Sequence, residues 1–210
     1  MILESFPVGV LGCNCTIIGN ETSHEALVID PGGNPERIEE RLSKHDLTVK
    51  QILLTHAHID HIGALARIKK LTGAPVFLCG DDLALLQAAP QQAALFGMPT
   101  PEFVLPDEGL DDGQTVGLEH FPATVLHTPG HTQGSVCFYF GAEGLLIAGD
   151  TLFAGGIGRT DLPGGDAQQI FTSIRTKLLT LPDVTRVVPG HGPGTTIGAE
   201  RRGNPFLQEM

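Results

Sequence analysis

Short apolar segments alternate along the chain with segments in which apolar residues recur every three or four positions. The short segments are rich in β-branched residues and end at turn residues, which is typical of buried strands. Strands are therefore predicted at 15–19, 26–30, 50–56, 75–80, 115–120, 123–128, 135–140, 144–150 and 185–192.

The periodic segments predict amphipathic helices at 34–46, 62–73 and 166–180, and a short helix with a cap at 198–208. Asn34 is the expected N-cap of the first helix, with Pro35 at its first position, and Gly73 is the expected C-cap of the second. Pro90 does not suit a helix interior, so the segment 81–97 predicts two short helices.

Two strand-rich halves, each followed by helices, predict an α/β fold: an αββα sandwich of two mixed sheets flanked by helices. The length of 210 residues suits one compact domain, and no linker, charge block or low-complexity segment divides it. We therefore expect residues 1–210 to form a single domain.

The composition narrows the function classes. The formal net charge of −11 gives the chain no electrostatic reason to bind nucleic acid or an anionic membrane. The N-terminus does not resemble a signal peptide, and no apolar run is long enough to span a bilayer. Four scattered cysteines are expected to be reduced thiols. These features indicate a cytoplasmic protein, either a monomer or a small homo-oligomer.

The segment LLTHAHIDHIGAL, residues 53–65, concentrates titratable side chains where an apolar strand ends. It holds His56, His58, Asp60 and His61 in the pattern H-x-H-x-D-H. A solvated turn is the alternative interpretation, but this spacing rarely arises by accident. The pattern therefore indicates metal ligands.

Three more polar residues follow other predicted strands. His131 lies in HTPGHTQGS, Asp150 ends GLLIAGD, and His191 lies in RVVPGHG. Loops at strand ends are where layered α/β proteins build their sites. We expect these three residues to join the first cluster.

Imidazole and carboxylate groups suit zinc, and also iron or manganese. Seven such side chains exceed the needs of one tetrahedral ion and divide naturally between two. Two neighbouring metal ions would lower the pKa of a shared water and clamp the attacking oxygen. The sequence therefore predicts a dinuclear hydrolytic site with two divalent ions per chain, most simply zinc.

With these residues, the chain resembles the metallo-β-lactamase-fold hydrolase superfamily over essentially its full length. Within it, the chain resembles the short bacterial form of glyoxalase II (hydroxyacylglutathione hydrolase). The supporting segments are NCTIIG, VIDPGG, ILLTHAHIDHIGA, TPGHTQGSVCF, GDTLFAGGIGRTDLPGGD and VVPGHGPGTTIGAERRGNPFL. The resemblance implies that His56, His58 and His131 hold the first metal and that Asp60, His61 and His191 hold the second. Asp150 is implied as the bridging carboxylate.

The resemblance also implies the reaction, hydrolysis of S-D-lactoylglutathione to D-lactate and glutathione. The attacking hydroxide would reach a thioester carbonyl polarised by a metal ion. Asp60, which can accept a proton from the nucleophilic water, is the expected general base. The partner is then a small glutathione thioester.

Long-form glyoxalase II enzymes carry a C-terminal helical extension that binds glutathione, and we expect this chain to depart from them by lacking it. Arg159 corresponds to their basic loop residue and is expected to hold a glutathione carboxylate, with Arg201 or Arg202 as a second contact. The alternatives are a salt bridge from Arg159 to Asp161 or Asp166 and a surface role for the arginine pair. The missing extension predicts weak affinity or a different thioester.

Other functions fit the same pattern less well. A persulfide dioxygenase would use one iron held by His56, His131 and Asp150, leaving the second-metal set idle. A true β-lactamase typically has cysteine or serine in place of Asp150. A non-catalytic metal-binding module would usually close its site with four Cys or His ligands.

Overall fold

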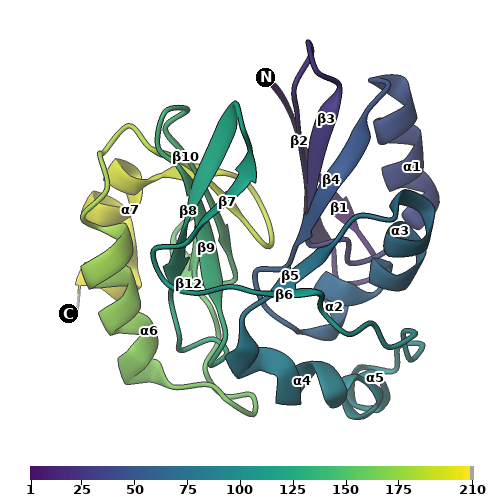
Figure 1. Ribbon diagram of the computed structural model, residues 1–210. Helices are drawn as coiled ribbons and strands as arrows, with labels where there is room; N and C mark the ends of the chain where they lie inside the picture. The colour runs from purple at the N-terminus through teal and green to yellow at the C-terminus, as the bar shows by residue number, and fades with distance from the viewer. Residues whose placement is uncertain (209–210) are drawn as a thin grey trace. The chain divides into compact units, whose positions relative to one another are not determined.

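The computed structural model describes residues 1–208 and comprises two compact units. The first unit consists of Met1–Leu110 and Gly117–His120, and the second of Asp111–Val116 and the residues from 121 onward. Each unit holds a six-stranded sheet, and α1 and α3 belong to the first unit while α6 and α7 belong to the second (Figure 1).

The sheet of the first unit has the order β1-β2-β3-β4-β5-β6. Strands β1 to β3 pair antiparallel, and β3 to β6 pair parallel, so the sheet is mixed. The strands are β1 Ile2–Val8, β2 Cys13–Gly19, β3 Glu25–Ile29, β4 Thr48–Leu53, β5 Val76–Leu78 and β6 Glu108–Gly109. The helices are α1 Pro35–Lys44, α2 Ile59–Ile62, α3 Leu65–Thr72, the 3₁₀ turn η1 Gly80–Asp82, α4 Leu83–Gln87 and α5 Ala89–Phe96.

Helices α1 and α3 pack against this sheet through the apolar faces that the periodicity predicts. Ile38 and Leu42 of α1 are buried with Ile68 of α3 in one core that also holds Val28 and Ile52 of the strands. Burying each such side chain contributes about 1.5–3 kcal/mol relative to an exposed position.

Two predicted caps have different outcomes. Gly73 ends α3 with a left-handed backbone, φ 67°, and its N–H donates to the carbonyl of Lys69, which confirms the C-cap. Asn34 stands at the N-cap position of α1, but its side chain does not bond the helix. Its Oδ1 instead accepts the N–H of Gly9. The predicted N-cap position of Asn34 and the predicted place of Pro35 are confirmed, without a side-chain bond to the helix.

The sheet of the second unit has the order β14-β13-β10-β9-β8-β7. It is also mixed, because β10 and β13 are parallel, whereas β13 with β14, β10 with β9, and β9 with β8 pair antiparallel. The strands are β7 Thr115–Leu118, β8 Phe121–His127, β9 Val136–Phe140, β10 Leu145–Gly149, β13 Arg186–Pro189 and β14 Thr195–Thr196. Strands β11 Leu152–Phe153 and β12 Gly156–Ile157 form a separate pair. The last two residues of β7 are assigned to the first unit.

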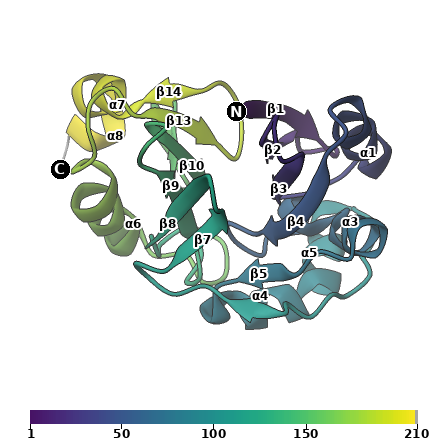
Figure 2. The same ribbon diagram turned by 45° about the horizontal axis from the view of Figure 1, so that its top comes forward.

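Helices α6 Ala167–Ser173, α7 Ile197–Gly203 and α8 Pro205–Gln208 follow the strands of the second unit. Helices α6 and α7 lie on the same face of the sheet in both views (Figure 2). The predicted helix at 166–180 begins as α6 and continues as a π-helical segment, η2 Ile174–Leu178. The apolar face predicted for it consists of Ile170, Phe171, Ile174 and Leu178. All but Phe171, which is partly buried, are fully buried in one core with Leu146.

Two mixed sheets with helices confirm the predicted fold class. Strand β1 was not predicted. Helix α3 starts at Leu65, three residues after the start of the predicted helix at 62–73. Two short helices around Pro90 are confirmed. No helix within residues 1–208 is long and apolar enough to cross a membrane. The single-domain organisation stays a prediction.

Candidate metal centre

The H-x-H-x-D-H segment forms a dense cluster in the first unit, on the loop after β4 and on α2. The ring of His56 lies 4.8 Å from that of His58 and 4.0 Å from that of His61, measured between centroids. His61 Nε2 lies 3.9 Å from Asp60 Oδ2. All four side chains are buried, so four metal-ligating groups share one small volume.

Hydrogen bonds define which nitrogen of two of these histidines carries the proton. His61 Nδ1 lies 2.9 Å from Asp30 Oδ2, and a carboxylate accepts, so Nδ1 donates. Thr55 Oγ1 gives its single proton to Asp30 Oδ2 at 2.6 Å and therefore accepts from His56 Nδ1 at 3.0 Å. Both rings consequently present Nε2 as a lone-pair donor, which is the arrangement of imidazoles that bind metals.

Asp30 is a residue of this site that the sequence analysis did not identify. It follows β3 directly, has a left-handed backbone with φ 50°, and accepts the N–H of Thr55 at 2.8 Å. A signal was present, because Asp30 ends an apolar strand as Asp150 does. Cys13 was also missed: its Sγ lies 3.4 Å from His61 Nδ1, and burial raises the pKa of its thiol to about 12.

Glycine permits a close backbone approach beneath the first cluster. A Cβ on Gly32 would lie 1.6 Å from the carbonyl oxygen of Asp60, and one on Gly63 would lie 2.4 Å from the carbonyl oxygen of Gly32. The chain after β3 and the α2 segment therefore touch backbone to backbone. A side chain at either glycine would therefore push these two segments apart.

The second unit assembles the other three predicted ligands around one carboxylate. Asp150 follows β10, and its Oδ2 lies 3.5 Å from His131 Nε2 and 3.7 Å from His191 Nε2. His131 Nδ1 donates to the carbonyl of Arg159 at 2.8 Å, which again leaves Nε2 as the lone-pair donor. A Cβ on Gly158 would lie 1.9 Å from the carbonyl of Asp150, so this cluster also depends on a glycine.

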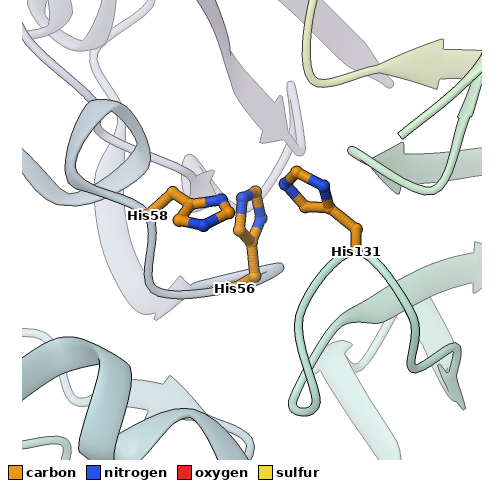
Figure 3. A group of neighbouring side chains, drawn as sticks. All are labelled: His56, His58 and His131. Atoms are coloured by element: carbon orange, nitrogen blue, oxygen red, sulfur yellow. The ribbon is translucent and has the colours of Figure 1, made fainter. Parts of the chain in front are cut away.

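Figure 3 shows three of the predicted ligands on their own elements. His56 and His58 stand on the loop after β4 with their rings edge to face, at an interplanar angle of 88°. His131 stands on the loop between β8 and β9 of the second unit. Each unit thus presents its own histidines and one carboxylate, Asp60 in the first unit and Asp150 in the second. Groups of these types suit zinc, iron or manganese.

The three arginines predicted to bind substrate have protein partners. Arg159 forms a bidentate ion pair with Asp161, with both N···O distances at 2.7 Å, which is the alternative named for it. Arg201 Nη2 donates to the carbonyl of Leu181 at 3.0 Å, and both Arg201 and Arg202 pair with Asp183. These contacts favour a structural role for the arginine pair, and substrate binding by any of the three stays a prediction.

The chain is similar to several known proteins along nearly its whole length. Among curated relatives, hydroxyacylglutathione hydrolase GloC of Haemophilus influenzae is 42% identical over 209 residues, covering 99% of this chain and 98% of that protein. The structure of BLEG-1 B3 metallo-beta-lactamase is 40% identical, with a TM-score of 0.92 over 98% of this chain and 99% of the other. The structure of TTHA1623 in a di-iron-bound form is 43% identical, with a TM-score of 0.87 over 96% and 98%.

The family model of the metallo-beta-lactamase superfamily matches residues 8–191, a range that contains all seven predicted ligands. The relatives match the chain along nearly its whole length, and the solved structures share its fold. The chain therefore belongs to the metallo-beta-lactamase superfamily and has the fold of that superfamily.

Proposed function

We propose that the protein is a dinuclear metallohydrolase that cleaves a small acyl thioester, with S-D-lactoylglutathione as the substrate. Seven side chains would hold two divalent ions. The first ion would be held by His56, His58 and His131 and the second by Asp60, His61 and His191, with Asp150 between them.

The observation that carries this proposal is that buried contacts hold and orient the predicted ligands of the second ion. A mononuclear site needs only His56, His131 and Asp150. Yet His61 is fully buried, is oriented by Asp30, and directs Nε2 toward the Asp60 carboxylate. Holding a polar cluster in this way without a ligand would cost several kcal/mol in desolvation. A second ion explains why the chain maintains it.

Each residue has a defined part in the reaction. Bound divalent ions would act as Lewis acids toward the thioester carbonyl and lower the pKa of a bound water to about 7. Asp60, buried at the edge of the cluster, would accept the proton from that water. Asp30 and the carbonyl of Arg159 keep His61 and His131 in the required tautomers. The thiolate leaves without strong acid assistance.

The thioester class is supported by the relative named hydroxyacylglutathione hydrolase, which matches this chain end to end at 42% identity. In this proposal Arg159 binds a glutathione carboxylate by exchanging its exposed partner Asp161 for the substrate. Water screens an ion pair between exposed side chains, so the exchange would cost little.

Two other activities on the same fold serve as alternatives. The di-iron-bound relative supports iron as a metal for this scaffold, which keeps an iron-dependent persulfide dioxygenase as a rival. The B3 metallo-beta-lactamase at 40% identity makes β-lactam hydrolysis the second rival. Each consumes a different substrate, so one preparation can be tested against all three.

The deciding experiment combines metal counting by elemental analysis with turnover of S-D-lactoylglutathione on one preparation. We expect about two ions per chain and rapid thioester loss. One iron per chain with oxygen consumption on glutathione persulfide, or hydrolysis of a chromogenic β-lactam without thioester turnover, would overturn the proposal.

The variant His61→Ala tests the second ion directly. It should lose one ion and most hydrolysis while keeping the far-ultraviolet circular dichroism of the wild type. His120→Ala is the matched control, because His120 is exposed and belongs to neither cluster. Full activity in His61→Ala would refute the dinuclear mechanism.

A further inference from the structure

The loop between His56 and Asp60 has an irregular, buried backbone that must find hydrogen-bond partners outside itself. Ala57 lies in this loop and Ile59 begins α2, and both are buried. Buried backbone groups left without hydrogen-bond partners destabilise the fold. The residues that supply these hydrogen-bond partners therefore hold the predicted metal ligands in place.

Two side chains from the α4–α5 region bond three backbone groups of this loop. Asp82 Oδ2 accepts the N–H of Ala57 at 2.9 Å. Gln92 Oε1 accepts the N–H of Ile59 at 2.9 Å, and Gln92 Nε2 donates to the carbonyl of Ala57 at 3.2 Å. Both side chains are buried. The backbone on both sides of His58 is thus held from one direction.

Asp82 stands at a position where an aspartate side chain commonly accepts hydrogen bonds from its own helix. It is the N-cap residue of α4, a position that favours aspartate because its side chain can accept helix N–H groups. In this structure the Asp82 side chain makes no capping bond to α4. Its carboxylate oxygen is instead committed to the loop, 25 residues earlier in the chain.

Gln92 also connects the two helices that carry the pair. Its Nε2 donates to the carbonyl of Leu85 in α4 at 2.9 Å, while the residue itself belongs to α5. The side-chain amide therefore uses both its oxygen and its nitrogen, and it joins α4, α5 and the ligand loop. A residue needed only to fill space would be apolar here, since burying an amide requires all these bonds.

We propose that Asp82 and Gln92 are positioning residues for the metal centre, acting through the backbone of residues 57–59 on His58 and its neighbours. The inference rests on the proposed function, because it supposes that the cluster binds metal. Ligands need placement to within about 0.5 Å, and loss of groups that orient ligands typically costs 10–100-fold in metal affinity. Neither side chain is assigned a contact with substrate.

The experiment measures metal affinity by competition with a chromogenic chelator, together with the thermal midpoint, for Gln92→Leu and Asp82→Ala. Gln51→Leu is the matched control. Gln51 lies in β4 of the same unit, and its Oε1 accepts the N–H of Gly117 at 2.9 Å, so this variant also deprives a backbone donor of its acceptor. We expect a 10–100-fold weaker Zn²⁺ affinity in the first two variants and wild-type affinity in the control.

Asp82→Asn keeps the test decisive if the other variants fold poorly. Asparagine retains an oxygen that can accept the N–H of Ala57. The Zn²⁺ affinity of Asp82→Asn should therefore lie within about threefold of wild type, a much smaller change than the loss expected for Asp82→Ala. Folded variants with lower thermal midpoints but unchanged Zn²⁺ affinity would overturn the inference and leave the pair with a purely structural role. If the wild type binds no metal in the same assay, the proposed function fails instead, and the two failures are distinguishable.

Discussion

The close approach of Gly32 to Asp60 gives the sharpest test of how the loop from His56 to Asp60 is positioned. In Gly32→Ala, the new methyl carbon would lie 1.6 Å from the Asp60 carbonyl oxygen and 2.8 Å from its carbonyl carbon. Contacts under 3.0 Å do not occur at Cβ atoms, so the two chain segments must separate by about 1.4 Å. Both partners are backbone, so no side-chain rotation relieves the overlap.

The expected cost follows from that displacement. Over-packing a tight contact costs about 1–3 kcal/mol, and for a chain of this length 3 kcal/mol corresponds to a thermal midpoint about 6–12 °C lower. A shift of more than 1 Å at Asp60 exceeds the tolerance for catalytic placement and should lower kcat/KM about a hundredfold or more.

The assays are differential scanning fluorimetry, zinc stoichiometry and thioester turnover. Gly109→Ala is the control, since Gly109 lies in β6 of the same unit and a Cβ there meets nothing within 4 Å. A Gly32→Ala protein with wild-type zinc content and turnover would refute the view that this backbone contact sets the position of Asp60.

Three further predictions concern other parts of the molecule. Arg159→Ala should mainly raise KM for a glutathione thioester while kcat changes little, and an unchanged KM would leave Arg159 with only its ion pair to Asp161. Burial acts to raise the pKa of Glu4, but hydrogen bonds from His45 and two basic residues of α1 lower it to about 2. Glu4 therefore stabilises the fold fully above about pH 4.5, and this contribution is lost as the pH falls from 4.5 toward 2. Urea unfolding of Glu4→Gln should accordingly show a smaller loss of stability across that range than the wild type, and equal losses would contradict the assignment. Burial raises the pKa of Cys137 to about 11, and all four thiols are buried, so a disulfide reagent should label four thiols only after denaturation; rapid labelling of the folded protein would contradict their burial.

Local chemistry explains which parts of the fold could be predicted from the sequence. Gly73 was predictable because a left-handed C-cap is set by one residue, and the buried face of Ile38 and Leu42 follows from spacing alone. The strand β1 was missed because Pro7 interrupts its pattern. The N-cap position of Asn34 was predictable, but the partner of its side chain was not, because Gly9 belongs to a distant hairpin.

The same reasoning applies to the candidate site. The predicted ligands stand at strand ends, so the residue type and the preceding apolar run identify them. Asp30, Asp82 and Gln92 act on the ligand loop from 25 to 35 residues away along the chain. Their partners depend on the parallel pairing of β3 with β4 and on the packing of α4 and α5, which no short pattern encodes. A single sequence therefore identifies the predicted metal ligands more readily than the residues that position them.

Strand β1 is the outermost strand of its sheet, and this has a consequence for how the protein behaves in concentrated solution. An edge strand offers unpaired amide groups to any neighbouring chain and can start intermolecular β-pairing. Here Pro7 removes one amide donor, and Glu4 is surrounded by Arg41, Lys44 and His45. Charged side chains on an edge strand oppose its pairing with another chain. The ion pairs that hold β1 to α1 therefore also oppose aggregation through this edge strand.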